Sequence, residues 1–366
     1  MKIECVLEKL KKFISVVDRI TGKNLTLSVL SSILLIASGK TLKLRATNLD
    51  IGIEVEIPVK IIKEGAIAVK GSTLNELLSN LTSDKIIILE EINNNLSITT
   101  DQTKSTLKCQ PINDFPTIPL ITSGTSIIIN TQKILSGIRS VAYSASLSDI
   151  KPELASVYIY HNDDSLVFVA TDSFRLAEKK IKFKVNDDFP PIIVPYKNII
   201  EIMRVLELSN EDVKLSISRN QISLSFNNVY LTSRLIDSTF PDYKQIIPKE
   251  TNTEAIVLKQ DLITSLKINN IFTDKFNQVT MDISPKHKKF TISSQCGEVG
   301  ETNTNLNAAL KGDDLVVHIN HRYLFDVFQS ITSDSISMSF MGNTKPLVIR
   351  GISDQMFMYL VMPLNR

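Results

Sequence analysis

Side chains that commonly carry out catalysis are few in this chain and widely separated. The four histidines are His161, His287, His318 and His321. Adjacent acids occur as Glu90-Glu91, Asp163-Asp164 and Asp313-Asp314. No histidine lies in a nucleophile-elbow or metalloprotease pattern, and the acids fall in predicted turns or strand ends, where they are solvated. With no glycine-rich phosphate loop and no Cys/His cluster, these residues predict no catalytic site, no metal and no cofactor.

The cysteines and the first residues indicate the compartment. Cys5, Cys109 and Cys296 are an odd, widely spaced set, with no two at metal-ligand spacing. We therefore expect free, buried thiols in a reducing compartment. The chain begins with a strand-like alternation rather than a signal peptide, and no apolar run approaches the roughly 20 residues that span a membrane. A cytoplasmic protein is predicted.

Two segments stand out from the surrounding strand and turn patterns. Residues 169–177 follow a strand and break its alternation, with Asp172 and Arg175 among them. Residues 358–366 are strand-like up to Pro363 and keep apolar residues that a frayed terminus does not normally have. Elsewhere, we expect His161 to be exposed beside an Asp-rich turn and His318 to be a hydrogen-bonded sheet residue.

A repeat organises the elements that must position these segments. Apolar residues fall at helical spacing in residues 7–20, 131–142 and 260–271, and a second helical pattern follows each of them, at 74–81, 199–206 and 324–331. Equivalent positions recur after about 125 residues, a period that indicates whole domains in tandem. Three domains of one architecture are predicted, at residues 1–120, 126–244 and 245–366.

Short strands fill the rest of each domain. Residues 41–47, 215–218 and 221–226 alternate with period two, whereas 86–89, 166–169 and 315–319 are more continuously apolar, as in buried strands. Each third thus has two helices and roughly eight strands, an α+β unit with the helix pair on one side of a sheet. Residues 111–126 and 237–256 lack periodicity and are predicted to be interdomain linkers.

Charge is modest overall but repeats on the helices. The formal net charge is +2 and the pI is about 8.2, below the usual range for a strongly basic nucleic-acid-binding domain. Five of the six predicted helices carry cations opposite their apolar stripe, among them Lys12, Lys133, Lys197, Lys267 and Arg322. A repeated, weakly basic surface is suited to sequence-independent contacts with duplex phosphates.

Four motifs in order give the chain a specific resemblance. They are Ala170-Thr171-Asp172-x-x-Arg175-Leu176-Ala177, Ile192-Ile193-Val194-Pro195 with the helix pattern after it, Phe240-Pro241-Asp242-Tyr243, and Tyr359-x-Val361-Met362-Pro363. Together with the three-fold repeat, they resemble the bacterial DNA polymerase III beta subunit family, the sliding clamps. The resemblance extends from end to end of the chain.

The resemblance implies a fold and a function. Members of that family form a head-to-tail homodimer, a closed ring of six domains around duplex DNA with twelve helices lining the hole. The ring is not an enzyme: it tethers the replicative polymerase and so raises its effective concentration at the primer end. The implied partners are duplex DNA, the DNA polymerase III catalytic subunit, the clamp loader and other proteins with a clamp-binding motif.

The family's partner pocket receives a short linear peptide between its second and third domains. Carried over by position, it uses Leu154, Thr171, Ser173, Phe174, Arg175, Leu176, Pro241, Gln245, Ile246, Pro346, Leu360, Met362, Pro363 and Leu364. The chain departs from the family at Ser173-Phe174, at Gln245 and at Asn365-Arg366. We expect a more apolar pocket near Phe174 and an altered peptide preference.

Further positions are implied for DNA and for the subunit interface. The DNA-binding candidates are Lys12, Lys23, Asn24, Ser72, Ser148, Lys151, Lys197 and Arg204, with Lys23 in the place of a displaced basic residue. The interface candidates are Lys104 and Leu107 on one side and Ile271, Phe272, Glu298 and Glu301 on the other. Leucine against isoleucine and phenylalanine, with lysine against glutamate, makes an apolar contact with a charged rim.

Two alternative functions remain at this point. The first is a multidomain nucleic-acid-modifying enzyme with Asp172 and Arg175 as catalytic residues, which needs a second acid, a base or a metal site that the sequence does not offer nearby. The second is a monomeric protein-interaction scaffold that does not bind DNA. Retention on circular but not on linear DNA separates a ring from both.

Overall fold

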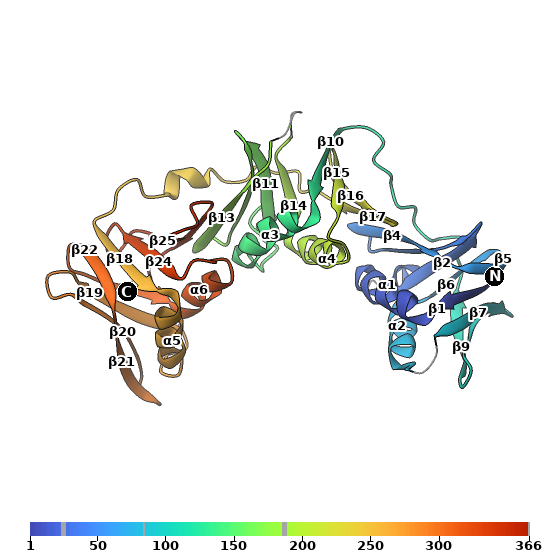
Figure 1. Cartoon of the computed structure of the whole chain (residues 1–366), viewed down its shortest axis with the longest axis horizontal. Helices are drawn as coiled ribbons and strands as arrows, with labels where there is room; N and C mark the ends of the chain where they lie inside the picture. Colours follow the sequence, from blue (N-terminus) through green and yellow to red (C-terminus); the bar gives the residue numbers. More distant parts are fainter. Residues whose placement is uncertain (23–26, 83–84, 185–188, 365–366) are drawn as a thin grey trace. The chain divides into compact units, whose positions relative to one another are not determined.

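A computed structural model describes residues 1–22, 27–82, 85–184 and 189–364 (Figure 1). The chain divides into two compact units. One contains Met1–Leu135 and Lys197–Leu235, and the other contains Ser136–Tyr196 and Ile236–Arg366. The middle third of the sequence is therefore shared between the two units, because sheet pairing crosses the predicted domain lines.

The first unit is built on one antiparallel sheet of 13 strands. In spatial order these are β10 (Thr125–Asn130), β15 (Asp212–Ser218), β16 (Gln221–Phe226), β17 (Val229–Arg234), β4 (Ile51–Pro58), β3 (Thr41–Thr47), β2 (Ser32–Ser38), β6 (Gly65–Lys70), β9 (Lys104–Gln110), β8 (Asn95–Thr99), β7 (Ile86–Ile92), β1 (Lys2–Val6) and β5 (Lys60–Lys63). The join between β17 and β4 brings strands from the first and second thirds of the sequence into one sheet.

The second unit holds two antiparallel sheets. The nine-stranded sheet runs β14 (Ile192–Pro195), β11 (Ser156–Asn162), β12 (Ser165–Thr171), β13 (Arg175–Lys182), β26 (Phe357–Val361), β25 (Leu347–Gly351), β24 (Ser335–Phe340), β18 (Thr253–Leu258) and β22 (Ala308–Gly312). The four-stranded sheet runs β21 (Gly300–Leu306), β20 (Lys289–Cys296), β19 (Gln278–Ser284) and β23 (Leu315–Asn320). Pairing of β13 with β26 joins the second and third thirds of the sequence.

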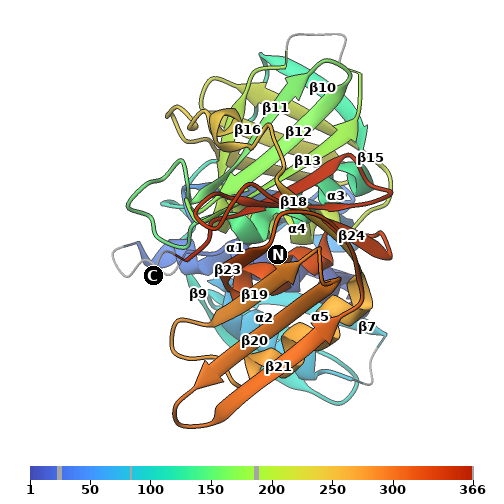
Figure 2. The same cartoon turned by 90° about the vertical axis from the view of Figure 1, so that its left-hand side faces the viewer.

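The helices lie where the apolar periodicity predicts them. The described residues hold six: α1 (Leu7–Ile20), α2 (Gly71–Asn80), α3 (Thr131–Val141), α4 (Tyr196–Leu206), α5 (Lys259–Asn270) and α6 (His321–Asp326). In α1 the buried stripe contains Leu10, Ile14 and Val17, as its spacing requires. Helix α5 lies against β20 and β21 of the four-stranded sheet (Figure 2).

Two helices show how tertiary contacts modify the local pattern. The last helix is shorter than predicted, because α6 ends at Asp326 and a 3₁₀ turn, Val327–Gln329, follows it. Just beyond that turn, the Ser330 hydroxyl donates to the Ser140 carbonyl at 3.0 Å. In α3, Gly137 lets the helix approach Phe168 so closely that a Cβ would lie 2.4 Å from its ring.

Several predictions about exposure are wrong. His161 is half-buried, and its Nε2 is buried without a hydrogen-bond partner. Among the cysteines only Cys5 is buried, whereas Cys109 and Cys296 are partly exposed. The strands near 86 and 315 are not fully buried, because Ile86 is 59% exposed and Val316 is 50% exposed. Antiparallel sheets often have one solvated face.

The segments predicted as linkers also differ from free tethers. Strands β10 and β18 begin inside the predicted ranges, at Thr125 and Thr253. A 3₁₀ turn, Tyr243–Ile246, forms in the second linker, and Phe240 and Tyr243 are buried in a hydrophobic core. The apolar side chains of this linker are thus used in packing, which periodicity alone does not reveal.

Candidate peptide-binding, DNA-facing and subunit-edge residues

The turn between β12 and β13 is fixed by its own side chains. The Thr171 hydroxyl donates to the Arg175 carbonyl at 2.6 Å, and one Asp172 oxygen accepts from the backbone N–H groups of Phe174 and Arg175, both at 2.9 Å. Ser173 has φ of 79°, the left-handed region that a serine rarely adopts. This conformation leaves the Phe174 side chain 60% exposed at the tip of the turn.

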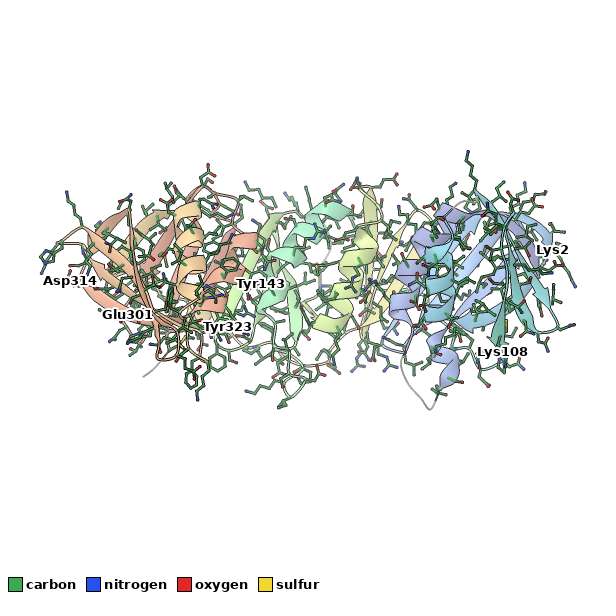
Figure 3. The ribbon with its side chains drawn as sticks, turned by 90° about the horizontal axis from the view of Figure 1, so that it is seen from below. Lys2, Lys108, Tyr143, Glu301, Asp314 and Tyr323 are labelled. Carbon is green, nitrogen blue, oxygen red and sulfur yellow. The ribbon has the colours of Figure 1, made fainter. Side chains whose placement is uncertain are left out.

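Arg175 connects this turn to α6. Its Nε donates to Asp172 at 2.9 Å and its Nη1 to Asp326, while its guanidinium carbon lies 4.7 Å from the centre of the Tyr323 ring. Tyr143, in the 3₁₀ turn Ala142–Ser144 that follows α3, approaches the same guanidinium at 5.9 Å (Tyr143 and Tyr323 are labelled in Figure 3). Burial acts to lower the pKa of Arg175, but Tyr359, Asp326 and Asp172 outweigh burial and raise that pKa. Asp172 and Arg175 are therefore occupied by structural contacts, which does not favour a catalytic role for them.

The carboxy-terminal strand is part of the sheet core. In register with β13, Leu360 of β26 lies opposite Leu176, and these two side chains are 1% and 0% exposed. Beyond the strand, the Met362 N–H donates to the Phe174 carbonyl at 2.8 Å, and the Leu364 N–H donates to the His318 carbonyl at 2.8 Å. The tail is thus attached to the 171–175 turn at one point and to β23 at another.

The predicted pocket residues separate into an exposed group and a buried group. Exposed or half-buried are Ser173, Phe174, Arg175, Pro241, Gln245, Ile246, Met362 and Leu364. Buried are Leu154, Thr171, Leu176, Pro346, Leu360 and Pro363. Met362 packs against the core that contains Leu176, Leu360 and Tyr243, so the tail, the turn and the linker meet over a common apolar floor. The Leu154 N–H and carbonyl form hydrogen bonds within the 146–154 loop, to Lys151 and Ser146.

The structure adds residues that sequence reasoning missed. Tyr323 and Asp326 contact Arg175 from a helix about 150 residues further along the chain. Tyr243 of the linker forms a hydrogen bond with Glu178 of β13. The three-residue spacing of Tyr323 and Asp326 places both on one helix face. Nothing in the sequence indicates which strand or turn that face meets.

The candidate DNA-binding residues are on the surface where they are described. Lys12, Ser72, Ser148, Lys151 and Lys197 are exposed. Arg204 is different: it is half-buried and forms an ion pair with Glu201 one turn earlier in α4. Lys23 and Asn24 lie outside the described residues. Exposed cations also occur at Lys133 and Arg139 of α3, Lys267 of α5 and Arg322 of α6.

The candidate interface residues lie on two strand edges. Strand β21, with Glu301, is an edge of the four-stranded sheet, and β9 pairs with β6 only near Cys109, so Lys104 to Leu107 have a ladder partner on one side alone. Lys104, Glu298 and Glu301 are exposed, and Leu107 is half-buried. Ile271 is 64% exposed, while the neighbouring Phe272 ring lies over Gly300 of β21. Figure 3 labels Lys108 and Glu301, which mark these two strands.

Two absences hold for the described part of the chain. No group of three or more His, Cys, Asp or Glu side chains there is arranged to hold a metal ion. None of its helices combines the length and the apolar character that crossing a membrane requires.

Comparison with known proteins identifies all three thirds of the chain. The N-terminal, central and C-terminal domains of the DNA polymerase III beta subunit match residues 1–119, 128–242 and 244–365. The beta sliding clamp of Synechococcus elongatus is 26% identical, over 100% of this chain and 99% of that protein. The Bacillus subtilis beta sliding clamp is 24% identical over 100% of both chains.

Solved structures agree with this match. The crystal structure of the DNA polymerase sliding clamp from Bacillus subtilis superimposes with a TM-score of 0.94 at 25% identity, covering 100% of this chain and 99% of that one. The beta sliding clamp of C. crescentus gives a TM-score of 0.93 at 26% identity, over 100% and 99% of the two chains. Because all three domains match in order from end to end, this chain belongs to the DNA polymerase III beta subunit family.

Proposed function

We propose that this protein is a ring-shaped processivity factor that encircles duplex DNA and tethers the replicative DNA polymerase and repair proteins to it. The observation that carries the proposal is the ordered match of three beta subunit domains over the whole chain. The protein slides without sequence specificity and catalyses no reaction. A cytoplasmic location, where chromosomal DNA is replicated, is part of the proposal.

A closed homodimeric ring of six domains, each with a pair of helices, follows from this assignment. The domains of one chain extend over 1–120, 126–244 and 245–366. Support comes from the two strand edges, since β9 carries Lys104 and Lys108 whereas β21 and the turn before it carry Glu298 and Glu301. Edges of opposite charge favour pairing between two copies and disfavour pairing of like edges. The exposed Ile271 supplies an apolar contact beside the charged rim.

Contacts with DNA are proposed for the helices. Exposed lysines and arginines occur on α1, α3, α4, α5 and α6, and they are dispersed rather than clustered. Dispersed cations make many weak phosphate contacts, which are independent of sequence and permit sliding. The uncharged Ser72 and Ser148 are proposed as weaker contacts with DNA, and Lys151 follows Ser148 closely in the chain.

A peptide from each partner is proposed to bind over the turn 171–175, the linker and the tail. The partners are the DNA polymerase III catalytic subunit, the clamp loader and other proteins with a clamp-binding motif. The apolar floor beneath Met362 and the exposed Phe174 and Ile246 supply surface for aliphatic and aromatic anchors. Because Phe174 is exposed, we expect a stronger preference for apolar peptide side chains at that end.

Primer extension tests this function directly. A DNA polymerase III catalytic subunit copies a long singly primed circular template, with clamp loader and ATP, in the presence or absence of this protein. The proposal predicts much longer products per binding event when the protein is present. Products of unchanged length, with a loader shown to be active on another clamp, contradict it.

A further inference from the structure

The motif Phe240-Pro241-Asp242-Tyr243 is anchored at both aromatic ends. Phe240 is 8% exposed and Tyr243 is 5% exposed. Both belong to the core on one face of the nine-stranded sheet, which also contains Val169, Leu176 and Leu360. The linker therefore covers the place where β13 and β26 pair.

The Phe240 anchor is an aromatic stack. Its ring lies 4.7 Å from that of Tyr158 at an interplanar angle of 9°, and Tyr158 stacks in turn on Tyr160 at 5.0 Å. These tyrosines project from β11, two strands from β13. Stacked rings supply apolar contact in a preferred geometry.

The Tyr243 anchor is polar and directional. Its hydroxyl donates to the Glu178 carboxylate and accepts from the Tyr160 hydroxyl, 2.8 Å away. Glu178 is 8% exposed and projects from β13, with its other oxygen 3.4 Å from the Lys180 ammonium. Burial, followed by the Glu178 charge, raises the pKa of Tyr243, so this phenol stays a donor. A buried carboxylate that loses a donor carries a desolvation penalty, which makes the bond strongly favoured.

Between and beyond the anchors, the linker presents polar and apolar groups outward. The Tyr243 N–H donates to the Pro241 carbonyl at 2.8 Å, and the Gln245 side-chain amide donates to Asp242 at 2.8 Å. Pro241 and Gln245 are exposed, and Ile246 is 48% exposed. The three residues proposed to contact a partner peptide thus flank the Tyr243 anchor in one short turn.

We propose that Tyr243 and Glu178 are a positioning pair, which holds Pro241, Gln245 and Ile246 in the conformation that binds the partner peptide. This inference rests on the proposed peptide site. Glu178 lies on the same strand as Arg175 and Leu176, so the pair ties the linker wall of the site to the strand that carries the 171–175 turn. Neither residue touches the peptide. They act by reducing the conformational freedom that the linker loses on binding.

The test compares variants in the full-length protein with one matched control. The probe is a fluorescein-labelled synthetic peptide that ends in leucine and phenylalanine, and its Kd is measured by anisotropy. Tyr243→Phe removes the hydroxyl alone. The control is Tyr230→Phe, because the Tyr230 hydroxyl holds the other linker, donating to Pro119 at 3.0 Å and accepting from Ile121 at 3.1 Å. Hydrogen exchange of residues 243–247 is followed in each variant.

A second pair of variants separates positioning from stability. Glu178→Gln keeps an acceptor for the phenol, whereas Tyr243→Phe with Glu178→Leu removes the bond without leaving a buried charge. We expect Tyr243→Phe to raise the Kd for the peptide about tenfold and to accelerate hydrogen exchange in residues 243–247. For Glu178→Gln and for the Tyr230→Phe control, the Kd should stay within about twofold of the wild-type value. The double variant should regain thermal stability but not affinity.

Failure of this inference differs from failure of the proposed function. If wild type does not bind the peptide, the proposed peptide site is wrong, and the exchange data alone decide whether the pair anchors the linker. If Tyr243→Phe binds as tightly as wild type, or if exchange in 243–247 does not change, the pair does not position the linker. Recovery of both affinity and melting temperature in the double variant also overturns the inference, because it assigns the effect to stability.

Discussion

Arg175 on β13 and Asp326 on α6 lie 151 residues apart in the chain and form an ion pair. The same guanidinium binds Asp172 inside the turn that presents Phe174. One side chain therefore joins the proposed peptide site to a helix of the third domain. These contacts give Asp172 and Arg175, the catalytic candidates of the alternative enzyme function, a structural role.

Replacing Arg175 with methionine should destabilise the second unit. The side chain is 12% exposed and its Asp172 partner 15%, so the loss leaves a largely buried carboxylate with fewer partners. Removing one member of such a pair costs about 3 kcal/mol of unfolding free energy. Urea unfolding measures the change, with Arg219→Met, an exposed arginine, as the control. A change below about 0.5 kcal/mol shows that the ion pairs do not stabilise the unit.

Deleting Met362 to Arg366 should spare the fold and abolish peptide binding. Strand β26 ends at Val361, so the deletion keeps the sheet but removes the bond from Met362 to the Phe174 carbonyl. A longer deletion, from Phe357, removes a central strand and should unfold the second unit. Met362→Ala alone should weaken the peptide by about 1–2 kcal/mol, as expected for an interface anchor. Circular dichroism checks the fold and peptide titration checks binding. If deleting Met362 to Arg366 alone unfolds the second unit, the assignment of the tail to the peptide site is wrong.

Ile271→Ala together with Phe272→Ala should open the ring into folded monomers. Ile271 is 64% exposed just after α5, and it is followed by the half-buried Phe272, so two large apolar side chains lie together at this edge. Sedimentation at micromolar concentration measures the state, with Ile352→Ala, 49% exposed elsewhere in the third domain, as the control. A double variant that remains dimeric excludes this end of α5 from the interface.

Charge reversal at Lys12 and Lys197 should weaken DNA association without changing the fold. Both lysines are exposed on helices of the first unit, α1 and α4. Each lost phosphate contact should reduce the slope of log K against log salt by roughly 0.9. Lys63→Glu, on strand β5, is the matched control, and Arg204 is left unchanged because it pairs with Glu201. An unchanged salt slope shows that these two helices do not face DNA.

Acid should destabilise the second unit partly through His321. Burial lowers the pKa of this imidazole below 6.5; the Leu266 carbonyl, which accepts a hydrogen bond from it, opposes the shift, and Arg322 adds to it. The unfolded chain therefore binds the proton at higher pH than the folded one. Stability is full above about pH 6.5 and is lost as pH falls toward the folded pKa. His321→Gln should show a smaller loss between pH 7 and 5 than wild type, and His287→Gln, an exposed control, should not.

Local pattern predicts the helices well and the contacts between distant segments poorly. The stripe Leu10, Ile14 and Val17 is a property of one helix, so sequence alone determines which face is buried. The Ser330 hydroxyl, just beyond the early end of α6, donates to the carbonyl of Ser140, which is 190 residues away. The sequence pattern of neither segment predicts that contact.

The candidate site shows the same division. Ser173 and Phe174 are predicted pocket residues, and the turn that exposes them is built from Thr171 and Asp172 within the same short segment. Leu176 and Leu360 are also predicted pocket residues, and they lie opposite each other as buried floor residues because β26 pairs with β13. The sequence of neither strand indicates that it pairs with the other.

Retention on circular DNA tests the central claim most directly. The protein is loaded by a clamp loader onto a nicked circular duplex, the complex is isolated by gel filtration, and half of the sample is cut once with a restriction enzyme. A ring that encircles DNA stays with the intact circle at moderate salt and is lost after linearisation, because it slides off the ends. Equal retention on circular and linear DNA, or none on either while the loader is active on another clamp, contradicts the account.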